Sequence, residues 1–415
     1  MEIPQWQRAL FDRRTLGIHL GLDVVRAAYE RLGRPGRAIP AVHVVGTNGK
    51  GSTSAMVAHG LREAGRKVGL FTSPHLHRIG ERVQVDGAPL DDDALKGYVD
   101  RVLEIDAIGD LPGPISFFEI LTLAALMAFE DAGIDNAVFE CGLGGRLDAT
   151  RVANIELTLF TPIALDHLRL LGPDLATIAG EKAAVLENHA PAISAAQLPT
   201  PRAVLNAAAA RWGTALRFVG EAARAPKGLP GAHQRQNAGL ALAGLAELLG
   251  PERATIELLD GVRWPGRLET IRRGAGTMTF DVAHNPHGVA ALARHLAATP
   301  APAAGRLIVF GCMVGKDGPE MIRALAQLGA PMLVVPPGAR EGWDAAQLGE
   351  AVGERAEIAA APSFDAPEAQ AAIAERLAAG GEVVVCGSCY LVGAVRGRIL
   401  DEAEDALLLA DPPAN

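Results

Sequence analysis

A glycine-rich turn around a lysine, residues 44–56 (VVGTNGKGSTSAM), is the stretch whose residue types most directly suggest chemistry. Lys50 offers a point charge to a phosphate group, and Ser52 or Thr53 offers a hydroxyl to Mg²⁺. A helix beginning after the turn would add the positive end of its dipole. Three glycines allow successive backbone N–H groups to point at one anion, namely Gly46, Gly49 and Gly51. The turn therefore predicts a phosphate-binding loop.

This loop departs from the common phosphate-binding pattern G-x-x-x-x-G-K-[ST]. Val44 stands where the first glycine is required, and the hydroxyl comes one residue late, at Ser52. An ordinary strand-to-helix turn is the alternative. A lysine between two glycines directly after an apolar strand is unusual in a mere connection, so phosphate binding is the preferred interpretation.

Polar side chains follow three other apolar stretches of strand length. Ser73 follows VGLFT, Glu140 follows NAVF, and Asp166 and His167 come shortly after LTLFTPI. Ligands of open α/β sheets bind at the carboxyl ends of the strands, so these residues and the glycine loop together predict a magnesium–nucleotide site. Taken singly, Glu140 is compatible with a solvated strand end and His167 with a helix-capping histidine. Their joint placement favours the functional interpretation.

Strand-length apolar stretches alternate with helical patterns in two runs, which indicates an α/β protein with two mainly parallel sheets. The strands expected in the first run are 41–45, 68–73, 136–141 and 157–163, with a long helix over 118–133. The strands expected in the second run, each followed by a helical stretch, are 277–282, 306–311, 331–336 and 382–388. The turn-rich stretch 221–234 is expected to be a loop.

The linker-like VRWPGRLE at 262–269 separates the two runs, and 415 residues suffice for two domains. We expect a domain at 1–262 with a P-loop-type, mainly parallel sheet and helices on both faces. We expect a smaller Rossmann-like α/β domain at 263–415.

The formal net charge of −9 and the absence of a basic run argue against a general nucleic-acid binder. The first residues lack the apolar core of a signal peptide, and the stretch ILTLAALMAF is far too short to span a membrane. We therefore expect a cytoplasmic protein that contacts neither membrane nor nucleic acid. The four cysteines are too few and scattered for a disulfide framework: Cys141, Cys312, Cys386 and Cys389. The last two form a lone C-x-x-C with no second pair to complete a metal site.

Eleven short motifs follow one another over nearly the whole chain. They are HVVGTNGKGST, TSPHL, ERV, FFEILTLAAL, ECGLGGRLDAT, ALDH, GEKAAV, HQRQNA, WPGRLE, DVAHNPHG and CGSCYLVG. In this order they resemble the folylpolyglutamate synthase and dihydrofolate synthase family, within the Mur-type ATP-dependent amide ligases. The family's variant loop, G-T-N-G-K-G-S, accounts for the missing first glycine. The resemblance implies an ADP-forming ligase that joins L-glutamate to dihydropteroate or a reduced folate through an acyl phosphate.

The resemblance also implies that the domain at 1–262 binds ATP and that the domain at 263–415 binds the amino acid and closes on ATP. Nucleotide contacts are therefore expected in both domains. In the phosphate loop they are Thr47, Asn48, Gly49, Lys50, Gly51, Ser52 and Thr53. Farther along, Asn237 would reach the nucleotide, Arg267 its phosphates and Asp281 its ribose, while His284 would lie beside the closing cleft. The spacing of Asp281, His284 and His287 also suggests a metal site, although His287 is more simply explained as the start of a helix.

Two Mg²⁺ sites are implied in the same way. Ser52, Ser73 and Glu140 would bind the first ion, and Glu140, His167 and Lys182 would surround the second. An ammonium group has donors only and cannot ligate a cation. The family carbamylates the matching lysine, which would make Lys182 an anionic ligand. Without the resemblance, Lys182 is better explained as a surface lysine of the helix expected over 174–186.

The acceptor is the least determined part of the resemblance. The residues implied to border it are Phe118, Asp148, Ala149 and Arg151. The family usually has asparagine where this chain has Arg151, and threonine where it has Leu168. A dihydrofolate synthase with or without folylpolyglutamate synthase activity is therefore weighed against a Mur-type ligase for a different carboxylate. A nucleotide-binding regulator without turnover is a third hypothesis, which the intact catalytic residues disfavour. We expect a monomer.

Overall fold

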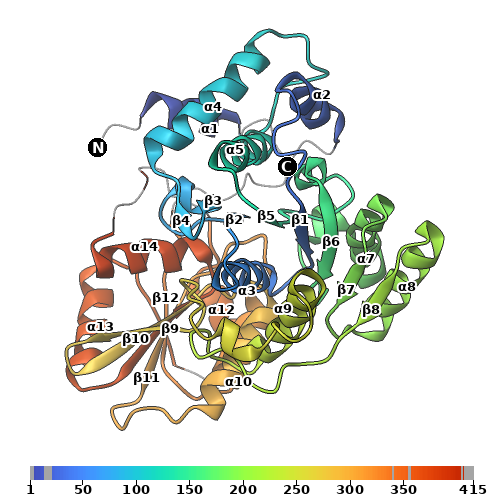
Figure 1. The fold of residues 1–415 in the computed structure, drawn as a ribbon. Helices are drawn as coiled ribbons and strands as arrows, with labels where there is room; N and C mark the ends of the chain where they lie inside the picture. Colours follow the sequence, from blue (N-terminus) through green and yellow to red (C-terminus); the bar gives the residue numbers. More distant parts are fainter. Residues whose placement is uncertain (1–3, 14–20, 339–340, 354–356, 403–404, 406–415) are drawn as a thin grey trace. The chain divides into compact units, whose positions relative to one another are not determined.

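The computed structural model describes residues 4–13, 21–338, 341–353, 357–402 and 405. The chain forms two compact units (Figure 1). The first unit comprises Met1–Gly228, Gln234–Val262 and Asp405–Asn415, and the second comprises Leu229–His233 and Arg263–Glu404. The chain therefore passes from one unit to the other four times, and one of these passages lies between Val262 and Arg263.

The first unit is built on an eight-stranded sheet with the order β4-β3-β2-β5-β1-β6-β7-β8. Its strands are β1 (Ala41–Val45), β2 (Val68–Phe71), β3 (Val83–Val85), β4 (Ala88–Pro89), β5 (Asn136–Glu140), β6 (Ile155–Phe160), β7 (Ala192–Ser194) and β8 (Leu216–Phe218). All neighbours pair in parallel except β2 with β3 and β3 with β4. The four strands at the centre, β2, β5, β1 and β6, thus end at one edge.

Helices cover both faces of this sheet. The helices of this part of the chain are α1 (Gln5–Asp12), α2 (Asp23–Arg31), α3 (Lys50–Glu63), α4 (Asp92–Ala107), α5 (Phe117–Ala132), α6 (Leu168–Leu171), α7 (Leu175–Ala183), α8 (Pro199–Trp212) and α9 (His233–Leu249), with short 3₁₀ turns η2 (Ile79–Arg82), η3 (Ala149–Val152), η4 (Ala184–Asn188) and η5 (Ile256–Leu259). On one face, Phe139 of β5 packs against Phe129 of α5, with ring centroids 5.7 Å apart. On the other, Leu159 of β6 lies against Gly244 of α9.

Local signals fix the ends of α5, the helix at the centre of the core. Ser116 accepts a hydrogen bond from the Glu119 N–H, and the Glu119 carboxylate accepts one from the Ser116 N–H. This reciprocal capping satisfies backbone donors that a helix start leaves open. Gly133 ends the helix at φ 59°, a left-handed conformation that glycine adopts without strain.

The second unit contains a six-stranded sheet with the order β13-β12-β11-β14-β10-β9. Its strands are β9 (Glu269–Arg273), β10 (Gly276–Asp281), β11 (Arg306–Phe310), β12 (Met332–Val334), β13 (Ile358–Ala360) and β14 (Glu382–Cys386). Its helices are α10 (Pro286–Ala298), α11 (Gly318–Ala326), α12 (Ala345–Val352), α13 (Pro367–Ala378) and α14 (Cys389–Leu400). Only β9 runs antiparallel, so this unit is a Rossmann-like α/β sheet.

After the second unit the chain returns to the first at Asp405. The Asp405 N–H donates to the His77 carbonyl at 2.9 Å. Its carboxylate accepts from the Ile79 N–H at 2.6 Å and from the Gln7 amide at 3.0 Å. Burial raises the pKa of this carboxyl group. The residue therefore joins α1 to the turn that precedes β3.

Candidate active site

The phosphate loop lies between β1 and α3, as the sequence predicts, and two of its glycines are sterically required. At Gly46 (φ 153°) a Cβ would come within 2.0 Å of the Thr161 hydroxyl. At Gly49 (φ 90°) it would come within 2.3 Å of the Asn237 side-chain oxygen. The Thr161 and Asn237 side chains thus lie in close contact with the loop backbone. The N–H groups of the loop and the start of α3 are the groups of this loop that suit an anion.

Polar contacts hold the side chains of the loop in place. The Thr47 hydroxyl is 3.1 Å from the Ala164 carbonyl, and the Lys50 amine donates to the Thr47 carbonyl at 3.3 Å. Ser52 is 1% exposed, and its hydroxyl accepts from the Gln234 amide at 3.3 Å.

Gln234 also accepts a hydrogen bond from the Asn237 amide at 2.9 Å. It therefore links the residue expected to bind magnesium, Ser52, to the residue expected to bind the nucleotide, Asn237. The sequence analysis did not select Gln234, although it lies three residues before Asn237 in the same motif.

Glu140 ends β5 and is 5% exposed, so it is not a solvated strand end. Its carboxylate accepts from the backbone N–H of Ser73 at 3.2 Å. The two residues expected to share the first Mg²⁺ are therefore neighbours at the carboxyl edge of β2 and β5. A buried carboxylate next to a serine hydroxyl offers the oxygen ligands that Mg²⁺ prefers.

His167 follows β6 and precedes α6 in a left-handed conformation, with φ 51°. Its backbone N–H donates to the Asp166 carboxylate at 2.8 Å, and 43% of its side chain is exposed. The Asp166 side chain is buried. Asp166 thus holds the turn that presents His167, a role that the sequence analysis did not assign to it.

Lys182 is not a surface lysine. It is 4% exposed, and its amine donates to the Gly46 carbonyl of the phosphate loop at 2.8 Å. Burial, together with the positive charge of Lys50, lowers the pKa of Lys182 to about 8. A lysine with this pKa is partly neutral near physiological pH, so its amine can react as a nucleophile.

The residues expected to border the acceptor lie mostly inside the protein. Phe118 packs on Gly142, where a Cβ would be 2.6 Å from its ring. Ala149 starts η3 and is buried. The Asp148 carboxylate accepts from the N–H groups of Leu143 at 3.0 Å and Thr150 at 3.1 Å. Asp148 therefore stabilises the conformation of its own loop. The guanidinium of Arg151 donates to the Glu187 carboxylate at 2.8 Å.

Asp148 also belongs to a buried group with His43 and Cys141, whose potential ligand atoms lie within 4.8 Å of one another. The Thr150 hydroxyl bonds both the Asp148 carboxylate and the His43 ring, the latter at 2.9 Å. Burial raises the pKa of the Cys141 thiol well above its usual value. The Asp148 carboxylate already accepts hydrogen bonds from backbone and hydroxyl donors, and the raised pKa keeps the Cys141 thiol protonated. We therefore interpret these three residues as a structural hydrogen-bond network and not as a metal site.

In the second unit, Asp281 organises the turn that carries Arg267. Its carboxylate accepts from the N–H groups of Leu268 at 3.0 Å and Ala283 at 2.9 Å, and burial raises its pKa. The His284 ring lies 2.9 Å from the Val282 carbonyl, and His287 is the second residue of α10. Within the described part of the chain, Asp281, His284 and His287 do not form a group with metal-ligand spacing, and Cys386 and Cys389 are free thiols.

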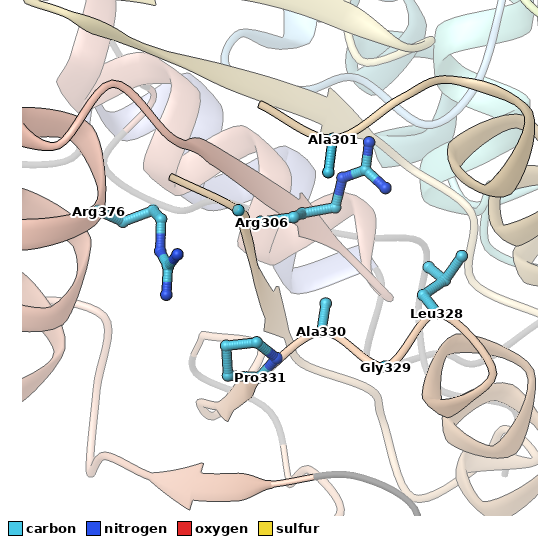
Figure 2. Close-up of a pocket in the computed structure, with 8 residues that line it drawn as sticks. Ala301, Arg306, Leu328, Gly329, Ala330, Pro331 and Arg376 are labelled. Atoms are coloured by element: carbon cyan, nitrogen blue, oxygen red, sulfur yellow. The ribbon is translucent and has the colours of Figure 1, made fainter. Parts of the chain in front are cut away.

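A cavity of about 220 Å³ lies at the opposite edge of the second sheet, near the starts of β11 and β12 (Figure 2). Arg376 flanks it on one side and Leu328 on the other. Both of its arginines are engaged, Arg306 with Glu382 at 2.7 Å and Arg376 with the Ala304 carbonyl. The cavity is therefore remote from Asp281 and does not contribute to the site.

The two sheets and their carboxyl-edge residues define a class, the two-domain ATP-dependent ligases of the Mur type. Residues 266–389 match the family model described as the Mur ligase, glutamate ligase domain. The chain is 31% identical to the dihydrofolate synthase/folylpolyglutamate synthase of Bacillus subtilis, over 94% of this chain and 97% of that one. It is 33% identical to the Escherichia coli enzyme of the same name, over 95% and 94%. The chain belongs to the dihydrofolate synthase/folylpolyglutamate synthase family.

Solved structures agree with this assignment. A Mycobacterium tuberculosis folylpolyglutamate synthase complexed with ADP and AMPPCP superposes with a TM-score of 0.84 at 31% identity, over 95% of this chain and 99% of that one. Escherichia coli FolC in complex with DHPP and ADP gives 0.83 at 30%, over 95% and 97%. The chain spans only 50% of a bifunctional Haloferax volcanii relative, with 33% identity over 95% of its own length. None of the described helices is long and apolar enough to span a membrane.

Proposed function

We propose that the chain is an ATP-dependent ligase that joins L-glutamate to dihydropteroate, with reduced folates as further acceptors. The observation that carries this proposal is the convergence of three features on one sheet edge. They are a phosphate loop that admits no side chain at Gly49, a buried Glu140 beside Ser73, and a buried Lys182 whose amine contacts the loop. The family relationship supplies the substrates: relatives carry both activities in their names.

The chemistry follows from the charges. A carboxylate is a poor acyl donor, so the γ-phosphoryl group of ATP is transferred to it, and the glutamate amine then attacks the acyl phosphate and releases phosphate. Negative charge gathers on oxygen atoms in both steps. In this proposal Lys50 and the N–H groups of the loop stabilise that charge in place, and Arg267 is the further cation expected at the phosphates. No covalent protein nucleophile is required.

The donors present fit a divalent cation. The Ser52 and Ser73 hydroxyls and the Glu140 carboxylate would hold one Mg²⁺, and Glu140 and His167 would hold a second together with Lys182. When bound, Mg²⁺ neutralises charge on the transferred phosphoryl group. The buried position of Glu140 suits this role, because a carboxylate removed from water interacts more strongly with a cation.

Lys182 would serve that second ion as a carbamate. Its neutral amine attacks carbon dioxide and a proton is lost, which leaves a carbamate with two oxygen atoms and one negative charge. Hard cations prefer such oxygen ligands. The depressed pKa supports this assignment, because only the neutral amine reacts.

Product analysis tests the proposed function. Purified protein with ATP and Mg²⁺ is offered dihydropteroate, tetrahydrofolate or muropeptide precursors, each with several amino acids, and amide products are identified by mass. We expect dihydrofolate from dihydropteroate and L-glutamate. Product only from a different carboxylate would establish a Mur-type ligase of another specificity, and no product from any pair would favour a regulator without turnover.

A further inference from the structure

The loop that follows β5, residues 141–152, contains most of the residues expected at the acceptor, and we call it the acceptor loop. It lies directly on α7. The Arg146 N–H donates to the Glu181 carbonyl at 2.9 Å, and the Arg146 side chain pairs with the Glu181 carboxylate at 3.0 Å. At Gly145 a Cβ would be 2.9 Å from the Lys182 carbonyl. The loop backbone thus touches the turn of α7 that carries Lys182.

Arg151 makes a second connection six residues farther along α7 and η4. One of its terminal nitrogens donates to the Glu187 carboxylate at 2.8 Å, and the other donates to the Arg146 carbonyl. Its side chain is 11% exposed, against 51% for Arg146. Both ends of the guanidinium are therefore bound within the protein. A planar guanidinium can hold two acceptors in fixed geometry, which the asparagine usual in the family is too short to do.

Both connections end on the segment that positions Lys182. Glu181 precedes Lys182 in α7, and Glu187 lies in η4, which continues α7 without a break. The Lys182 amine in turn contacts Gly46 of the phosphate loop. The acceptor loop, α7 and the phosphate loop are thus joined by one continuous series of contacts.

We propose that Arg151 and Glu187 are positioning residues that clamp the acceptor loop to the Lys182 segment and so set the acceptor carboxylate against the ATP phosphates. Arg151 acts on the acceptor through the loop and not by direct contact. This inference rests on the proposed function for its kinetic test. Geometry of this kind matters because small displacements of reacting groups slow a reaction strongly.

A double-mutant cycle tests the clamp. Arg151→Ala and Glu187→Ala should each raise KM for dihydropteroate about three- to tenfold and leave KM for ATP within about twofold. The double variant should be no worse than Arg151→Ala alone, because Arg151→Ala already removes the contact that Glu187→Ala removes. The charge exchange Arg151→Glu with Glu187→Arg should recover part of the loss. A matched control is the exposed pair Arg217 and Glu247, 2.7 Å apart on the same unit, whose alanine variants should behave as wild type.

Two kinetic results would contradict the clamp. If Arg151→Ala impairs the enzyme and Glu187→Ala does not, the contact between the two residues does not position the acceptor loop and the clamp is wrong. Unchanged kinetics in both variants would also overturn it. Hydrogen exchange without substrates gives a second readout: both variants should exchange faster than wild type over residues 141–152 and 175–188. If wild type makes no dihydrofolate, the proposed function fails, and the exchange result still decides the clamp.

Discussion

At the scale of single residues, the site depends on groups whose burial changes their chemistry. Lys182 is the clearest case, since the same burial that lowers its pKa also places its amine on the phosphate loop. A charged lysine there would repel a cation. The proposed carbamate would attract it, so in this proposal binding of the second metal ion depends on the protonation state of one amine.

Activation by carbon dioxide should therefore depend on pH. With a pKa of about 8, roughly a tenth of Lys182 is neutral at pH 7 and about nine-tenths at pH 9. At constant dissolved carbon dioxide, enzyme stripped of carbon dioxide should regain activity faster as pH rises over this range. ¹³C NMR with labelled bicarbonate should show one carbamate signal that Lys182→Ala lacks.

Lys182→Ala should also lower kcat about a hundredfold or more, as when one preorganised charged group is removed. Small added carboxylates should restore part of the rate by supplying the missing oxygen atoms. Near-normal turnover of Lys182→Ala, or a high-resolution map with an unmodified Lys182 pointing away from both ions, would contradict the carbamate.

Lys50→Ala should abolish turnover and leave the fold intact. The conformation of the loop is set by its glycines and by Thr47, so the lysine is needed for charge and not for shape. Steady-state assays should show loss of at least about a hundredfold in kcat, with an unchanged melting temperature without ATP. A large fall in that melting temperature would show that Lys50 is structural.

At the scale of elements, β1 connects the site to the core through His43. The ring is fully buried, and its bond to Thr150 ties β1 to η3. Burial lowers the pKa of His43 to about 4. The unfolded chain thus takes up a proton at this residue before the folded chain does.

Acid should consequently destabilise the protein through His43. Its contribution to stability is complete above pH 6.5 and falls as pH drops toward 4, by at most about 3 kcal/mol. His43→Gln should flatten this part of the pH dependence of the urea midpoint. His189→Gln, which replaces an exposed histidine, is the control. If His43→Gln and wild type lose stability equally between pH 6.5 and 4.5, another group is responsible.

Much of this fold and part of the candidate site can be predicted from the sequence. Apolar stretches gave β1, β2, β5 and β6, and the residues after them lie at one sheet edge, as parallel strands require. The short strands β3, β4, β7, β8 and β13 were missed because segments of two or three residues show no clear hydrophobic period. β9 was missed because four of its five residues are polar or charged, which is typical of an edge strand.

The environment of each site residue was less predictable. Nothing local distinguishes Lys182 from an exposed helical lysine; its burial results from α7 packing against a loop 136 residues earlier in the chain. Arg151 was expected at the substrate, and its partner Glu187 lies 36 residues away in sequence. Contacts of this kind depend on the tertiary fold, whereas strand ends depend on local pattern.

At the scale of the whole molecule, the groups proposed to act on ATP are divided between two units. Lys50 and Glu140 belong to the first, and Arg267 and Asp281 to the second. Water hydrolyses an acyl phosphate, so we expect a ligase of this kind to complete its site only when its substrates are bound.

Phosphate release from ATP should accordingly reach its full rate only when acceptor and L-glutamate are both present. Omitting either should lower the rate about tenfold or more. A coupled phosphate assay under the four combinations of substrates measures this. Equal rates with and without acceptor would identify a plain ATPase.

The return of the chain at Asp405 has a consequence for how the protein is made. A ribosome delivers residues in order, and domains generally fold as they emerge. Here α1 and the turn at Ile79 precede the second unit in the chain, yet their shared partner Asp405 is synthesised only after that unit. Synthesis of the first unit therefore ends only after the second unit has been made. A chain that stalls or terminates before Asp405 leaves α1 and the turn at Ile79 without their hydrogen bonds to this residue, even if the rest of the chain has folded.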